Sequence, residues 1–247
     1  MTIWSDIEEL AYCATPIGEL QLRRRRDPAV PGQEIFEIRL GEEFLMSSLF
    51  HASEDALAAL ALARLASRSA GPWDVVVGGL GLGFTARAAL AQARVRSLLV
   101  VELLEPLIDW HQRALVPLGD ELCADPRCQL VAADFFAASA SADGFDAKQP
   151  GRCFDAVLLD IDHTPERLLD QRSGSFYCAE GLAGLARHLR PGGVFALWSD
   201  EPAGAEFESR LGDVFDNCRS HRVAFPNPYT GAESAGTVYV CDRRSES

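Results

Sequence analysis

The stretch VVVGGLGLGFTARAAL, residues 75–90, decides the fold. Its valines are typical of a buried parallel strand, and its alanine-rich end is typical of a helix. The turn between them contains Gly78, Gly79, Gly81 and Gly83. Glycine permits a tight turn and lets the backbone approach a ligand closely, so the last three are candidate ligand-binding positions. A strand, a glycine-rich turn and a helix in this order indicate a nucleotide-binding α/β unit, although turns also collect glycine for structural reasons alone.

Acidic residues stand at the ends of the strands that follow this turn. The next strand ends at Glu102, 19 residues after Gly83, and an acid at that spacing can bind both ribose hydroxyls of an adenosine. Asp134 ends the following strand, where it could bind the adenine amino group while Phe135 covers the ring. Asp160 ends the strand FDAVLL. Since the carboxyl ends of parallel strands face one crevice, we expect Glu102, Asp134 and Asp160 to converge on one ligand.

Two of the candidate acids also have a purely structural explanation, as caps of helices or turns. Asp134 is also well placed as a helix N-cap, and Asp162 as a cap on the segment HTPERLLD, so both alternatives stay open. Asp160 directly follows four apolar residues, which favours a position at the crevice. The glycine turn and Glu102 alone suit NAD as well as S-adenosylmethionine, whereas Asp134 favours S-adenosylmethionine.

The rest of the chain predicts two domains. Residues 1–50 contain short strand-like runs separated by proline and glycine, which indicates a small N-terminal antiparallel β-domain. In residues 51–247, apolar runs alternate with helical segments, which indicates a Rossmann-like domain with a parallel sheet and a final antiparallel pair. Its first helix is predicted to begin with Ser53 as a cap and acids in the first turn. The polar stretch 138–152 is a surface loop or a lid.

Composition excludes several functions. The chain has 247 residues and a formal net charge of -13, which disfavours nucleic-acid binding and favours a cationic ligand. Its first residues do not resemble a signal peptide, and no apolar run approaches the roughly 18 residues of a membrane span. The seven cysteines form no C-x-x-C pair and the histidines are scattered, so we expect reduced thiols, no metal site and a cytoplasmic protein.

From about residue 17 to 242, the chain resembles the spermidine synthase (aminopropyltransferase) family, within the class I S-adenosylmethionine-dependent methyltransferase fold. The resemblance rests on the N-terminal β-region and on VGGLGLG, VVELLEPLIDW, LVAADFF, FDAVLLDIDHTP and LRPGGVFALW. It implies an α/β fold with a mostly parallel seven-stranded sheet. It also implies transfer of an aminopropyl group to an amine or polyamine, with decarboxylated S-adenosylmethionine as co-substrate and no prosthetic group. A homodimer is left open.

The resemblance assigns roles to individual residues. Gly79, Gly81 and Gly83 would bind the donor, Glu102 its ribose, and Asp134 with Phe135 its adenine. Asp160 would be the catalytic aspartate, and Asp162 beside it is a second candidate catalytic residue.

Three motifs depart from the family pattern. The glycine turn lacks the acid that holds the donor amine in the family, DIDHTP replaces the usual Asp-Ser-Thr-Asp-Pro, and LMSS replaces a Tyr-Gln pair. Two alternatives therefore stay open: a methyltransferase that uses intact S-adenosylmethionine, and a catalytically silent nucleoside-binding protein.

Overall fold

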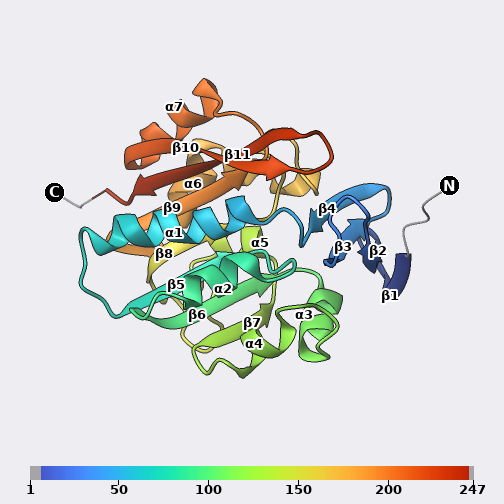
Figure 1. Cartoon of the computed structure of the whole chain (residues 1–247). Coiled ribbons are helices and arrows are strands. Elements are labelled where there is room, and N and C mark those ends of the chain that lie inside the picture. Colours follow the sequence, from blue (N-terminus) through green and yellow to red (C-terminus); the bar gives the residue numbers. More distant parts are fainter. Residues whose placement is uncertain (1–6, 245–247) are drawn as a thin grey trace.

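The computed structural model describes residues 7–244, which form two β-sheets linked by a long helix (Figure 1). Residues 1–6 and 245–247, the outer ends of the two predicted domains, lie outside the described residues. The first sheet, sheet A, is antiparallel with strands in chain order: β1 (Ile7–Thr15), β2 (Gly18–Arg26), β3 (Glu34–Leu40) and β4 (Glu43–Ser47). The chain passes from sheet A to the second sheet near residue 50. As a division into two domains, 1–50 and 51–247, this boundary stays a prediction.

The second sheet, sheet B, has seven strands in the order β10-β11-β9-β8-β5-β6-β7. The five strands from β9 to β7 in this order are parallel, and the last two strands of the chain add an antiparallel edge. This is the predicted mostly parallel, seven-stranded α/β architecture, and the prediction is confirmed. The strands are β5 (Trp73–Gly78), β6 (Val95–Glu102), β7 (Cys128–Ala132), β8 (Phe154–Leu159), β9 (Leu189–Ser199), β10 (Asp216–Asn227) and β11 (Ala232–Asp242).

Helices cover both faces of sheet B because its strands are apolar on both sides. In β5, Val75 and Val77 face a core formed with α1 to α4, whereas Val76 faces a core formed with α5 to α7. Sheet A lies beyond the carboxyl ends of the parallel strands (Figure 1). The helices are α1 (Ala52–Ala66), α2 (Phe84–Leu90), α3 (Glu105–Gln112), α4 (Gly119–Ala124), α5 (Phe135–Ala140), α6 (Ala179–Ala186) and α7 (Ala205–Val214), with a 3₁₀ segment at Gln171–Tyr177.

The start of α1 differs from the sequence prediction. The helix begins at Ala52 with His51 at its N-cap position, and no side chain caps it. Ser53 is not a cap but a buried residue whose hydroxyl lies where a side chain on Gly236 of β11 would be. The helix therefore begins two residues earlier than predicted, and Ser53 and Glu54 in its first turn are buried rather than solvated.

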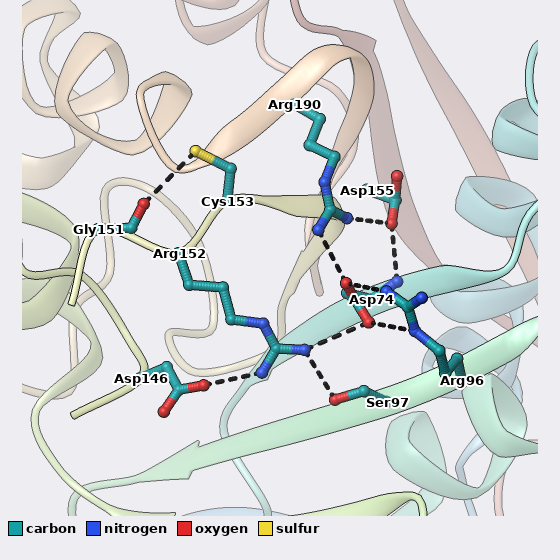
Figure 2. Close-up of polar contacts among 9 residues, drawn as sticks. All are labelled: Asp74, Arg96, Ser97, Asp146, Gly151, Arg152, Cys153, Asp155 and Arg190. Atoms are coloured by element: carbon teal, nitrogen blue, oxygen red, sulfur yellow. Dashed lines mark hydrogen bonds and ion pairs between the residues drawn. The ribbon is translucent and has the colours of Figure 1, made fainter. Parts of the chain in front are cut away.

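An ionic cluster joins the amino ends of four parallel strands (Figure 2). Asp74 of β5 has a side chain only 3% exposed and pairs with Arg96 of β6 at 2.7 Å, Arg190 of β9 at 2.8 Å and Arg152 at 3.2 Å. Asp155 of β8 accepts a hydrogen bond from the backbone N–H of Asp74 at 2.7 Å and also pairs with Arg190. Burial alone would raise the pKa of Asp74, but the hydrogen bonds from Arg96 and Arg190 and the charge of Arg152 hold it below its ordinary value.

The same cluster anchors the polar stretch 138–152. Arg152 pairs with Asp146 at 2.8 Å and donates to Ser97 of β6 at 3.0 Å. Phe145 of this stretch is buried against Phe135 and Phe154. These contacts favour the loop alternative over the lid.

The cysteine prediction was wrong for one pair. A disulfide joins Cys218 of β10 to Cys241 of β11, whereas five other cysteines are free. Antiparallel pairing brings the two together from 23 residues apart, so no spacing motif signals the bond. Within residues 7–244, no helix has the length and apolar character needed to cross a membrane.

We predict that Asp74→Asn lowers the free energy of unfolding by about 2–3 kcal/mol. This is less than the roughly 3–5 kcal/mol typical for breaking a buried ion pair, because Arg96 and Arg190 are exposed enough to be screened by solvent. The pKa of Asp74 is depressed in the folded state, so its contribution is present above the ordinary pKa of about 3.9 and is lost as pH falls through the folded value.

Urea titrations between about pH 3 and 7 check this prediction. The variant is expected to lose less stability on acidification than the wild type. Asp109→Asn, at an exposed pair with Arg113, is the matched control and should change little. Equal stability of Asp74→Asn and wild type at pH 7 would contradict the role given to the cluster.

Candidate active site

The glycine turn lies against the end of β8 and against sheet A. Gly79 and Gly81 have φ values of +94° and +47°, a left-handed conformation that favours glycine. A Cβ atom on Gly79 would collide with the backbone oxygen of Asp160, and one on Gly81 with the sulfur of Met46. Both glycines line a pocket at the carboxyl edge of sheet B, whereas Gly83 lies at the N-cap of α2, outside the pocket wall.

This first pocket brings together most of the predicted site residues. Glu102, Asp134, Phe135 and Asp160 all line it. A second pocket adjoins the first, sharing Glu102, Asp134, Leu103, Leu104, Phe136, Ile161 and Leu169. The three strand-end acids therefore line one pocket, which is the candidate active site, and their convergence on one ligand stays a prediction. The role of each residue toward a ligand stays a prediction.

Glu102 fixes the glycine turn to the end of β6. Its Oε2 accepts a hydrogen bond from the N–H of Leu80 at 2.9 Å, and its Oε1 accepts one from the N–H of Leu104 at 2.8 Å. Burial raises the pKa of Glu102, while these backbone donors act in the opposite direction. A carboxylate held in this way is a rigid acceptor at the floor of both pockets.

Asp134 caps α5, as one of the open alternatives proposed. Its Oδ1 accepts from the N–H groups of Phe136 at 2.9 Å and Ala137 at 3.1 Å. Neither bond uses Oδ2, so capping and ligand binding are compatible. Phe135 is buried, with its ring where a side chain on Gly78 would be, and Phe136 is the more exposed aromatic that lines both pockets.

Asp160 follows β8 and faces the first pocket. Its N–H donates to the carbonyl of Gly78 at 2.8 Å, and its Oδ2 accepts from the hydroxyl of Thr85 at 2.6 Å. Burial raises the pKa of Asp160 to about 6, against which the Thr85 bond acts. Burial therefore moves the pKa of Asp160 toward neutrality, and acids with raised pKa values often occur at functional sites.

Glu54 is a site residue that sequence reasoning missed. It lies in the first turn of α1, is 8% exposed and lines the same pocket as Asp160. Burial, together with the charge of Asp160, raises the pKa of Glu54 to about 8. The signal was present, since Glu54 precedes the buried Leu57 and Ala58 by three and four residues and so shares their helix face.

Asp162 is not brought to the first pocket. Its Oδ1 accepts from the N–H of Leu169 at 2.7 Å, and its Oδ2 accepts from the hydroxyls of Tyr177 at 2.7 Å and Ser173 at 3.3 Å. Burial raises the pKa of Asp162, and these donors act against that shift. The carboxylate thus holds segment 163–177 and touches only the second pocket.

Other polar residues near the site have structural partners. His163 lines the first pocket and pairs with Glu43 of β4 at 3.2 Å. Tyr229 does not line either pocket; its hydroxyl contacts Arg25 and Asp27 of sheet A. Among residues 7–244, no group of three or more histidine, cysteine, aspartate or glutamate side chains is arranged to hold a metal ion.

A mostly parallel sheet with strand-end acids around a glycine turn is the α/β architecture of the class I methyltransferase type. No protein-family model matches the chain. In sequence, 174 residues are 32% identical to polyamine aminopropyltransferase 2 of Pseudomonas aeruginosa, over 63% of this chain and 43% of that protein. The chain therefore spans less than half the length of this curated relative.

Solved structures extend the comparison to the fold. A spermidine synthase from Thermotoga maritima superposes with a TM-score of 0.70 at 16% identity, covering 96% of this chain and 74% of that one. A spermidine synthase in complex with the transition-state analogue AdoDATO gives a TM-score of 0.71 at the same identity and coverage. The chain thus has the spermidine synthase fold and, over part of its length, a sequence similar to that of a polyamine aminopropyltransferase.

We predict that Asp162→Asn loosens segment 163–177 without affecting sheet B. Hydrogen bonds to a charged acceptor are worth about 1.5–3 kcal/mol each, so amide exchange of Leu169 should accelerate at least about tenfold. Hydrogen exchange read by mass spectrometry checks this, with exchange of β5 and β6 as the internal control. Unchanged protection across 163–177 would show that Asp162 does not hold the segment.

Proposed function

We propose that the protein transfers an aminopropyl group from decarboxylated S-adenosylmethionine to a small amine or polyamine. The observation that carries the proposal is the convergence of Glu102, Asp134 and Asp160 on one pocket beside the glycine turn. The sequence likeness to an aminopropyltransferase supports the same reaction class. The donor is the only cofactor-like molecule that the proposal needs.

In this proposal, the adenosine of the donor lies across the floor of the two pockets. Glu102 would bind the ribose hydroxyls, because it is the fixed acceptor shared by both pockets. The free Oδ2 of Asp134 would accept from the adenine amino group, and Phe136 would lie against the ring. Phe135 would support that surface from below rather than cover the base.

The chemistry requires alignment and one proton acceptor. The lone pair of a neutral amine attacks the aminopropyl carbon bound to the sulfonium. The carbon–sulfur bond breaks, its electrons go to sulfur, and methylthioadenosine leaves. The new ammonium loses one proton, which Asp160 would accept because its pKa of about 6 leaves it ionised at neutral pH. The sulfonium is already a good leaving group, so the step needs no metal ion.

One observation favours a second candidate, methyl transfer from intact S-adenosylmethionine. The glycine turn carries no acid to hold a donor amine, and the N–H of Leu82 donates to the sulfur of Met46, which covers Gly81. This arrangement leaves the donor's side chain without a specific partner in the turn.

Calorimetry with both donors, in buffer containing EDTA, distinguishes these functions. We expect decarboxylated S-adenosylmethionine and methylthioadenosine to bind more tightly than S-adenosylmethionine and S-adenosylhomocysteine. Mass spectrometry of a mixed amine pool should then show aminopropylated products. Tighter binding of intact S-adenosylmethionine with methylated products would establish the second candidate. Binding of neither donor would overturn both and favour a catalytically silent protein.

We predict that Asp160→Asn lowers turnover by at least about 10²-fold, the usual scale for a lost general base. Donor affinity should change little, because Glu102 and Asp134 hold the nucleoside in this proposal. Wild-type turnover should rise as pH increases through about 6, where Asp160 loses its proton, and the variant should lack that rise. Asp109→Asn, at an exposed ion pair, is the control. Wild-type turnover by a folded Asp160→Asn variant would remove Asp160 from the mechanism.

A further inference from the structure

We infer that Glu54 is a second carboxylate of the active site and forms, with Asp160, a subsite that binds a protonated primary amino group. The inference rests on the proposed function for its choice of ligand, and it deepens that function by adding a specificity-determining residue. It is carried by the position of Glu54, by its lack of a cationic partner and by the walls around it.

The position of Glu54 follows from the packing of α1. Glu54 shares a helix face with Leu57, Ala58 and Ala61, which are fully buried in the core beneath the helix. An acid on this face would ordinarily be excluded from the core. Here Glu54 lies in the first turn of α1, and its side chain lines the first pocket together with Asp160.

No cation compensates the two acids. Within residues 7–244, no arginine, lysine or histidine forms an ion pair with Glu54. Among the same residues, the carboxylate of Asp160 accepts a side-chain hydrogen bond only from the hydroxyl of Thr85. The two histidines nearest in sequence contact other acids. His51 contacts Asp55 at 2.8 Å, whereas His163, which lines the pocket, contacts Glu43 at 3.2 Å and Asp200 at 3.8 Å. Two buried carboxyl groups without a counter-ion are costly, and an ammonium group from a ligand would relieve that cost.

The remaining walls favour an alkylammonium over a metal ion. Ile38 and Leu45 of sheet A and Trp198 of β9 line the same pocket, so the methylene chain of an amine would lie on apolar surface. The indole of Trp198 adds an aromatic surface of the kind that attracts cations. A metal would need further oxygen or nitrogen ligands, and none joins the pair among the described residues.

Titration of 1,4-diaminobutane into the free protein tests the subsite directly. The measurement is made at about pH 9, above the pKa of about 8 that burial and the charge of Asp160 give Glu54, where an alkylamine with a pKa of about 10 still carries a proton. The wild type should bind the diamine and not the neutral 1,4-butanediol. Glu54→Gln should weaken diamine binding at least about tenfold, since it removes a charged hydrogen bond.

Asp55→Asn is the matched control, because Asp55 is the next residue of α1 and pairs with His51 and Arg87 outside the pocket. Its diamine affinity should stay within about threefold of the wild type. Thermal unfolding gives a second readout. Glu54→Gln should unfold at a higher temperature than the wild type, because it removes an uncompensated buried acid, whereas a helix-stabilising role for Glu54 would give a lower one.

Absence of diamine binding to the wild type, or equal affinity in Glu54→Gln, overturns the inference. Its failure is distinguishable from failure of the proposed function. If Glu54→Gln changes neither donor binding nor transfer, the proposed function stands and the subsite is ruled out. If the protein binds the diamine through Glu54 but binds neither donor, the subsite stands and the proposed function is ruled out.

Discussion

The backbone of the glycine turn passes directly over the backbone oxygen of Asp160, and the site depends on this close approach. Only a residue without a side chain fits at Gly79, because a Cβ atom there would collide with that oxygen. The turn continues the parallel pairing of β5 with β8, and Glu102 holds it by accepting from the N–H of Leu80. The turn thus lies between the acids of β6 and β8, and Gly79 and Gly81 line the same pocket as Glu102 and Asp160.

The buried acids divide into three groups by how their charge is compensated. Asp74, at the amino edge of sheet B, is surrounded by arginines that hold its pKa low, so it stabilises the fold. Glu102 and Asp162, at the carboxyl edge, are held by several N–H or hydroxyl donors each. Asp160 and Glu54 have the fewest donors, and burial moves their pKa values to about 6 and about 8. The least compensated acids line the pocket, which is where perturbed groups are expected in a functional site.

The sequence predicted the features that depend on periodicity and chain order. The apolar runs, the glycine turn and the strand-end acids gave the architecture and the convergence of Glu102, Asp134 and Asp160, because parallel strands place their carboxyl ends on one edge. It did not predict features that depend on packing between distant segments. Asp162 finds its donors Tyr177 and Ser173 only after segment 163–177 folds back. Glu54 becomes a pocket residue only when α1 packs on sheet B, and Cys218 meets Cys241 only through the pairing of β10 with β11.

The central claim is that a donor nucleoside lies across the carboxyl edge, between the glycine turn and the strand-end acids. A crystal structure with methylthioadenosine tests it most directly. The account predicts the ribose hydroxyls on Glu102, the adenine between Asp134 and Phe136, and the thioether sulfur facing Asp160. A nucleoside bound away from Glu102, or a pocket left empty at saturating methylthioadenosine, would contradict it.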